Sequence, residues 1–197
     1  MSDYLNAKLA KLSVLYQDFK EQTAPFKTEQ ACAKGCAYCC TKAGSIDITT
    51  LEAWQIKSRI EGFSRSRLKT INRAIRQDIQ KREKKRINPC PFLMKNRACM
   101  IYNVRPFSCR RIYSLHVCDK DNPPKLNRRA MVLANQALKD LQALDDTGYS
   151  GHISFVLHMV NTSKFMDTYG TGRHNPKEIM AFGKSHGIII NKMVLSD

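Results

Sequence analysis

The sequence lacks cysteine over its first 31 and its last 79 residues, although the chain of 197 residues contains eight cysteines. Acidic residues are also scarce, because 17 Asp and Glu face 33 Lys and Arg, which gives a formal net charge of +16. No apolar run approaches the roughly 20 residues that cross a bilayer, so we expect no membrane partner. A P-loop, a GxGxxG sequence for a methyl donor and a Ser-His-Asp set are absent as well, which counts against a methylase.

The first residues also lack the uninterrupted apolar segment of a secretory signal peptide, because they include Asp3, Lys8 and Lys11. We therefore expect a cytoplasmic protein whose thiols are kept reduced. Disulfide frameworks are typical of short secreted domains with small cores, whereas this chain, 43% hydrophobic, is long enough to bury a core. Ligation of a metal or cluster is the favoured use of the cysteines, and disulfides or buried thiols are the alternatives.

The cysteines form two blocks, and the first cysteine of the second block follows the last of the first block by 50 positions. Ligands must converge, so two such blocks indicate the halves of one coordination centre. On a helix, the four cysteines of the first block would share a face, except that adjacent residues diverge by roughly 100°. One member of the Cys39-Cys40 pair could then serve a second site or remain a free thiol. We predict that all eight are metal ligands: Cys32, Cys36, Cys39, Cys40, Cys90, Cys99, Cys109 and Cys118.

Other residues near the cysteines fit the same chemistry. Basic side chains in and around both blocks would favour thiolate over thiol and offset the charge of several thiolates on a metal. His116 is the one histidine placed to join the site. We expect it to lie near the metal ligands or at the surface, and ligation by His116 is the alternative.

A series of motifs continues the cysteine pattern after the first block: Cys90-Pro91-Phe92-Leu93, Cys99-x-Ile101-Tyr102, Arg105-Pro106 and Cys109-Arg110. Together with the first block, these motifs resemble the bacterial cysteine-cluster family CxxCxxCC (YkgJ type), a zinc- or iron-chelating domain. The resemblance covers roughly residues 30 to 118. It departs from the family pattern in the first cysteine spacing, which is three residues instead of two, and in a turn that lacks glycine.

Flagellin lysine methylases are similar in this cysteine portion and are iron–sulfur proteins. The resemblance therefore implies a [4Fe–4S] cluster as the cofactor, with zinc as the alternative. The positions that best match the family, together with the CxxC spacing, predict Cys36, Cys39, Cys90 and Cys109 as the core ligands. Cys118 lies beyond the closest part of the match and is predicted to be the most dispensable.

Apolar periodicity predicts a mainly α-helical protein with a small β-hairpin around the Cys-rich site. We expect one domain over residues 1–197, with a cysteine-cluster core at 30–120, an N-terminal helix at 2–22 and a C-terminal helical region at 121–197. A capping box, Thr49-x-x-Glu52, is expected to start a helix after a short strand. Further helices are predicted over 65–86, 126–144 and 152–166 and from Asn175 onward. The helical pattern is expected to be interrupted at residues 148–151. A hairpin with its turn at residues 95–97 is predicted to present Cys90 and Cys99.

Three kinds of function remain open. The first is a protein that binds a metal or an iron–sulfur cluster, in redox chemistry, in metal handling or as a cluster-bearing accessory protein. The second is a metalloenzyme that modifies protein or RNA. The third is a nucleic-acid-binding module that a structural zinc ion stabilises. The sequence does not decide whether the protein is an enzyme.

A basic segment is the second unusual feature of the chain. Between Arg65 and Arg86 there are ten basic residues and two acidic ones, a net charge of +8. Such a stripe attracts polyanions, so RNA or an acidic protein is a candidate partner, and a solvated helix face is the alternative. The residues predicted to bind nucleic acid are Arg73, Arg76, Lys81 and Lys84.

Replacing these four residues with Gln is expected to weaken RNA binding and to reduce its dependence on salt, because fewer counterions are then released on binding. RNA titrations at several salt concentrations measure both quantities, and the metal content should stay unchanged. The control replaces the same number of charges elsewhere, at Lys125, Arg128, Arg129 and Lys139. Equal losses from the two sets would show generic charge attraction and remove the nucleic-acid interpretation.

Overall fold

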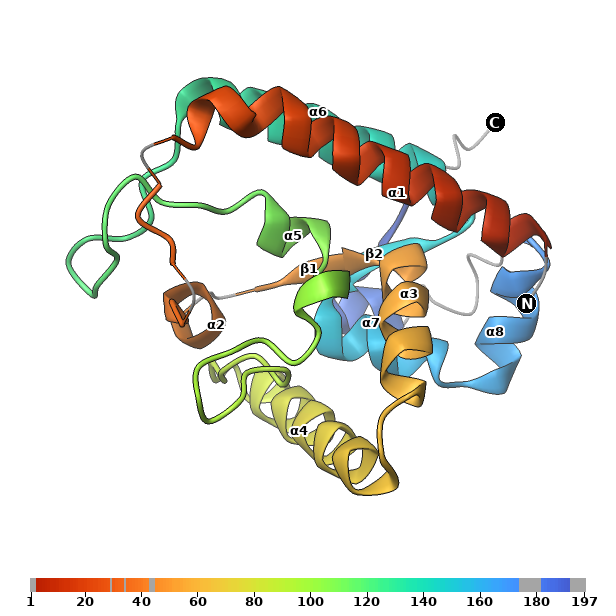
Figure 1. The fold of residues 1–197 in the computed structure, drawn as a ribbon. Coiled ribbons are helices and arrows are strands. Elements are labelled where there is room, and N and C mark those ends of the chain that lie inside the picture. Colours follow the sequence, from red (N-terminus) through yellow and green to blue (C-terminus); the bar gives the residue numbers. More distant parts are fainter. Residues whose placement is uncertain (1–2, 29, 34, 43–44, 174–181, 192–197) are drawn as a thin grey trace.

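Two long helices pack side by side along one edge of a mainly helical protein. α1 (Asp3–Thr23) runs antiparallel to α6 (Arg128–Leu144) across the top of Figure 1. The apolar spacing of α1 places Leu5, Leu12 and Phe19 on its buried face. The predicted N-terminal helix is therefore confirmed. The computed structural model describes residues 3–28, 30–33, 35–42, 45–173 and 182–191.

The remaining elements are short, apart from two helices near the middle of the chain. They are η1 (Ala24–Phe26), α2 (Tyr38–Lys42), β1 (Asp47–Thr49), α3 (Thr50–Glu61), α4 (Arg65–Glu83), η2 (Tyr102–Val104), α5 (Phe107–Arg110), β2 (Tyr149–His152), α7 (Ile153–Val160), α8 (Ser163–Gly170) and β3 (Ile189–Ile190). The prediction of a mainly α fold with a small β element is confirmed.

Two hydrophobic clusters meet at α3. One lies between α3, α4, α7 and the sheet and includes Ile56, Ile71 and Val156, all fully buried. The other lies between α1, α6 and α5 and includes Leu141 and Phe107. Because α3 contributes side chains to both clusters, it couples the long helix pair to the rest of the fold.

The strands form a three-stranded antiparallel sheet in the order β1-β2-β3. The expected interruption of the helical pattern at residues 148–151 is confirmed, and most of these residues form β2. Its Gly151 pairs with Ile48, and a side chain at this position would collide with Ile188. The glycine thus provides room for close packing within a strand, which a sequence pattern does not distinguish from a break.

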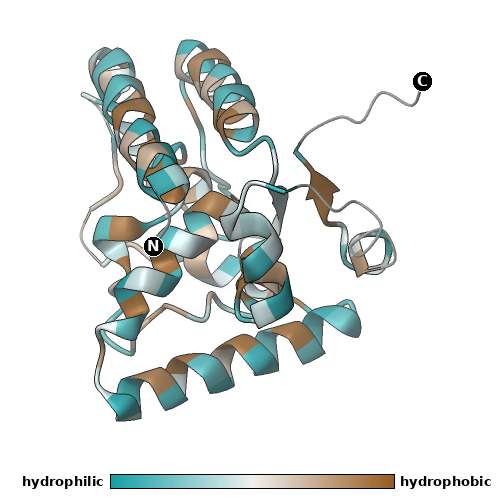
Figure 2. Ribbon diagram, turned by 90° about the vertical axis from the view of Figure 1, so that its right-hand side faces the viewer, coloured by the Kyte–Doolittle hydropathy of each residue, from teal (hydrophilic) through white to brown (hydrophobic). Residues whose placement is uncertain are grey.

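Helix α4 agrees closely with the prediction for the basic segment. Ser64 caps its first turn, and Ile71 and Ile75 are buried. Most of its other positions are exposed, and Figure 2 shows α4 at the bottom of the view as largely hydrophilic with separate hydrophobic positions. The helix therefore contacts the core through a narrow stripe and leaves its charge in solvent.

Two other expectations need correction. The helix predicted over 152–166 is two helices, α7 and α8, because the chain turns at Asn161 and Thr162. The predicted hairpin is reduced to one bridge, between Leu93 and Cys99, and the strands of the sheet lie elsewhere. The predicted helix start at Asn175 lies outside the described residues. None of the helices in the described part of the chain is long and apolar enough to pass through a membrane.

The carboxylate of Glu52 joins three elements inside the protein. It accepts hydrogen bonds from the Tyr16 hydroxyl on α1 (2.5 Å) and from the Phe107 amide at the start of α5 (2.6 Å). It also accepts one from the Thr49 amide (2.8 Å), which completes the predicted capping box of α3. Burial raises the pKa of Glu52, and these hydrogen bonds oppose that rise.

Replacing Glu52 with Ala is expected to destabilise the fold by about 3 kcal/mol, because three buried donors lose their acceptor. Denaturant unfolding monitored by circular dichroism measures this change. Glu61→Ala, at the exposed end of the same helix, should change stability by less than about 0.5 kcal/mol. Similar losses from the two variants would show that the buried carboxylate has no special role.

Candidate metal centre

The described residues of the first cysteine block form irregular chain and a turn before α2, and not the helix face that the spacing suggested. Only Cys39 and Cys40 lie on a helix, the short α2. Gly35 has a φ of 89°, in the left-handed region that favours glycine and interrupts a helix. The start of the block is bound to the segment around Ser114. The Ala31 amide donates to the Ser114 carbonyl (2.8 Å), and the Ser114 amide donates to Cys32 Sγ (3.2 Å).

A backbone hydrogen bond joins the second cysteine block to the first. The Cys90 amide donates to the Cys40 carbonyl at 2.7 Å, which places the two residues side by side. The bridge between Leu93 and Cys99 then brings Cys99 back toward Cys90, as the hairpin prediction required. At the turn, Arg97 donates from Nε to a carbonyl of the first block, that of Gly35, at 3.1 Å.

Cys109 is positioned by the start of α5. The Phe107 amide is bound to the Glu52 carboxylate, and the Cys109 amide donates to the Pro106 carbonyl at 2.9 Å. Arg110 donates from Nε to the Arg105 carbonyl at 2.7 Å, so an arginine braces the turn at the predicted Arg-Pro pair. Cys109 therefore faces the other cysteines from a third, separately anchored segment.

Four half-buried thiols on the side of the hydrophobic interior form what we call the buried set: Cys40, Cys90, Cys99 and Cys109. The Cys109 thiol interacts electrostatically with those of Cys90, Cys40 and Cys99. The Cys90 thiol interacts with those of Cys40 and Cys99. Cys90, Cys99 and Cys109 also pack against the hydrophobic cluster beneath α3 and α7.

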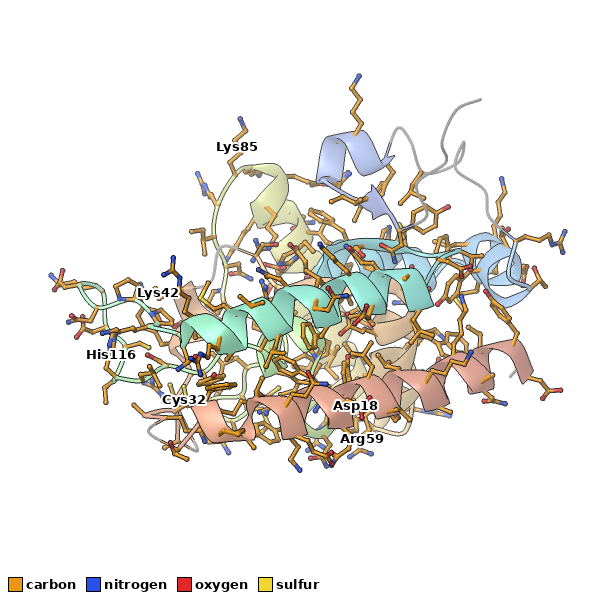
Figure 3. All side chains as sticks on the ribbon, turned by 90° about the horizontal axis from the view of Figure 1, so that it is seen from above. Asp18, Cys32, Lys42, Arg59, Lys85 and His116 are labelled. Atoms are coloured by element: carbon orange, nitrogen blue, oxygen red, sulfur yellow. The ribbon has the colours of Figure 1, made fainter. Side chains whose placement is uncertain are left out.

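The other four form the cavity set: Cys32, Cys36, Cys39 and Cys118. The Cys39 thiol interacts most strongly with Cys118, then with Cys32 and Cys36. Cys32, Cys36 and Cys118 line a surface cavity of about 250 Å³, together with His116, Arg97 and Tyr38. Figure 3 shows Cys32 and His116 at the same end of the molecule.

Burial raises the pKa of six of the eight thiols and so disfavours their thiolate form in the metal-free chain. Burial, followed by the charges of neighbouring thiols, raises the pKa of Cys39 to about 11. Burial also raises the pKa of Cys90 to about 12 and that of Cys109 further. All eight cysteines are free thiols. A bound cation would reverse this balance, because thiolate is the form that ligates metal and binding releases the protons.

The donor set fits a thiolate-bound metal or cluster, although its side chains are not yet arranged around an ion. In the described part of the chain, no three His, Cys, Asp or Glu side chains are arranged to hold a metal ion, so ligation requires thiols to turn. Arg105 supplies positive charge next to Cys99. Its Nε is buried and has no hydrogen-bond partner among the described residues, so it fits beside a negatively charged thiolate centre.

The residues predicted to bind nucleic acid lie apart from the cavity, on the exposed side of α4 or directly after its end. Arg73, Arg76, Lys81 and Lys84 are all exposed. Sequence reasoning missed Ser114, whose backbone holds Cys32 and which carries no sequence signal. It also missed Asp78, whose position in line with Ile71 and Ile75 on the apolar stripe could have indicated burial.

The sequence model of the CxxCxxCC family, described as "putative zinc- or iron-chelating domain", matches residues 31–132. This is just over half of the chain, and it includes all eight cysteines. The chain belongs to the CxxCxxCC family. The family description supports a metal cofactor of the zinc or iron class. No curated protein and no solved structure matches the chain, so the likeness to flagellin lysine methylases stays a prediction.

The carboxylate of Asp78 is buried near Cys90 of the buried set in this CxxCxxCC domain. Asp78 accepts hydrogen bonds from Arg82 Nε (3.1 Å) and from the Ser154 hydroxyl (2.5 Å), and His152 Nδ1 lies 3.7 Å from its carboxylate. Asp78 also interacts electrostatically with the Cys90 thiol. Burial, together with Arg82, lowers the pKa of His152 to about 4, against the opposing effect of Asp78 and Asp47.

The low pKa of His152 gives stability a predicted pH dependence. Between pH 6.5 and about 4 the unfolded chain binds a proton at this histidine and the folded chain does not, so stability falls as the pH falls. His152→Asn keeps an acceptor for the Ser154 amide but does not titrate. As the pH falls, the unfolding free energy of the variant should decrease less steeply than that of the wild type. The two slopes should differ by at most about 1.4 kcal/mol per pH unit.

Denaturant unfolding of both proteins at several pH values between 4 and 7 measures the two slopes. The same buffers and metal content serve both proteins, so the difference between the curves isolates the histidine. Parallel curves would show that His152 titrates alike in the folded and unfolded chain.

Proposed function

We propose that the protein binds a [4Fe–4S] cluster through its cysteine thiolates and acts in the cytosol in redox chemistry, in metal handling or as a cluster-bearing accessory protein. The observation that carries this proposal is the convergence of the buried set from three segments in a family described as chelating zinc or iron. Four cysteines are the ligand number of a [4Fe–4S] cluster.

The surroundings of the buried set favour a cluster over a single zinc ion. A tetrahedral zinc ion with Zn–S bonds of 2.3 Å would draw its sulfurs to about 3.8 Å from one another. A cluster is larger than an ion and would hold its four thiolates further apart. The apolar contacts of Cys90 and Cys99, with fully buried Phe92 between them in sequence, would exclude water from it.

Binding of RNA or an acidic protein is a second candidate function, supported by the exposure of the basic side chains of α4. The end of this helix leads within seven residues to Cys90. A polyanion bound to this helix would therefore lie within the CxxCxxCC domain and close along the chain to a cysteine of the buried set. The Gln variants described above test this candidate independently of metal content.

Protein purified without oxygen is expected to be brown, to absorb broadly in the visible and to contain iron and acid-labile sulfide in equal amounts. Cys90→Ser should remove most of this absorbance and lower stability, because binding and folding are coupled at such sites. Ala10→Ser, on an exposed position of α1, is the control for a new hydroxyl and should leave the absorbance unchanged. Colourless protein with stoichiometric zinc after growth in iron-rich medium would contradict the cluster and leave metal chelation standing.

A further inference from the structure

The adjacent cysteines Cys39 and Cys40 point toward different partners. They are consecutive on α2, so their side chains diverge by roughly 100°. The Cys39 thiol interacts most strongly with Cys118 and Cys32, whereas the Cys40 thiol interacts most strongly with Cys99 and then with Cys36. The backbone agrees, because the Cys40 carbonyl accepts its hydrogen bond from the Cys90 amide.

We propose that the protein holds two separate metal centres, one in the buried set and one in the cavity set, with α2 contributing one ligand to each. This inference rests on the proposed function and extends it, because it assigns a ligand set and a number of centres. Each set contains four cysteines, the number that completes a tetrahedral zinc site or a [4Fe–4S] cluster.

The local charges agree with two negatively charged centres. Arg105 lies beside Cys99 of the buried set, and Arg97 lines the cavity with Cys32 and Cys36. Four thiolates exceed the charge of one divalent ion by two, so each centre benefits from a nearby cation. The Arg97 side chain is fixed there by its hydrogen bond to the Gly35 carbonyl.

The cavity set is also supported by how it is assembled. Cys32 is held against the segment that carries His116 and Cys118 by the paired hydrogen bonds of Ala31 and Ser114. His116 Nε2 lies 3.0 Å from the Pro123 carbonyl, which positions the ring at the cavity wall. Cys118, expected from the sequence to be the most dispensable cysteine, is in this arrangement a ligand.

The two centres differ in their access to solvent. Cys36 is exposed and the cavity of about 250 Å³ opens at the surface, whereas the buried set packs against the hydrophobic cluster. Metal in the cavity set should therefore be released first by a chelator. The buried centre needs a local opening of the core before it can be reached.

The test compares two double variants with the wild type: Cys32→Ser/Cys118→Ser in the cavity set and Cys40→Ser/Cys99→Ser in the buried set. The readouts are metal and sulfide per chain, the rate of metal loss to a chelator, and circular dichroism. Wild type should contain two centres and lose metal in two phases that differ by at least about tenfold in rate. The cavity variant should keep its fold, half of its metal and the slow phase alone.

Each outcome distinguishes this inference from the proposed function. A folded cavity variant that loses all metal, or none, would overturn the division into two centres, as would wild type with one centre per chain. Wild type without metal or sulfide would instead contradict the proposed function itself. If the buried variant unfolds, the cavity variant and the two release phases still decide the question.

The one-centre ligand set expected from the sequence gives a different result in the same experiment. In the structure, two of its members, Cys36 and Cys39, belong to the cavity set, and the other two, Cys90 and Cys109, belong to the buried set. If these four formed one centre, the cavity variant would keep all its metal. Retention of half the metal separates the two assignments.

Discussion

The buried carboxylate of Glu52 is the interaction on which the arrangement of the domain depends. It is bound at once to α1, to the start of α3 and to the start of α5, three elements far apart in sequence. Two residues after its partner Phe107 lies Cys109, and the Glu52 charge reaches that thiol. The same hydrogen bonds that close the interior therefore also position Cys109 of the buried set.

The rest of the cysteine region is assembled by contacts between distant segments. The pairs formed by Ala31 with Ser114 and by Cys40 with Cys90 are backbone hydrogen bonds, which hold whatever the side chains do. Turning the thiols onto a metal then requires side-chain rotation more than movement of the chain. Because burial raises the pKa of thiols such as Cys90 and Cys39, a metal would both release protons and add bonds between these segments.

The excess basic side chains of the protein lie in two kinds of place, beside the thiols and on the exposed side of α4. A chain with a net charge of +16 keeps arginines beside both groups of thiols, where they offset thiolate charge. On α4 the basic side chains mostly face solvent instead. The exception is Arg82, which reaches the buried Asp78 behind Cys90. Metal chemistry and any polyanion binding thus use different parts of the same excess charge.

The sequence by itself determined the features that depend on neighbours along the chain. The capping box of α3, the narrow apolar stripe of α4, the helix at α1 and the family of the cysteine motif all follow from local spacing. Tertiary structure alone decided how the cysteines are grouped, why β2 tolerates Gly151, and that α7 and α8 are separate helices. The reason is that thiols 50 residues apart are brought together by hydrogen bonds between other residues, such as Ser114 and Glu52, whose partners no spacing in the sequence reveals.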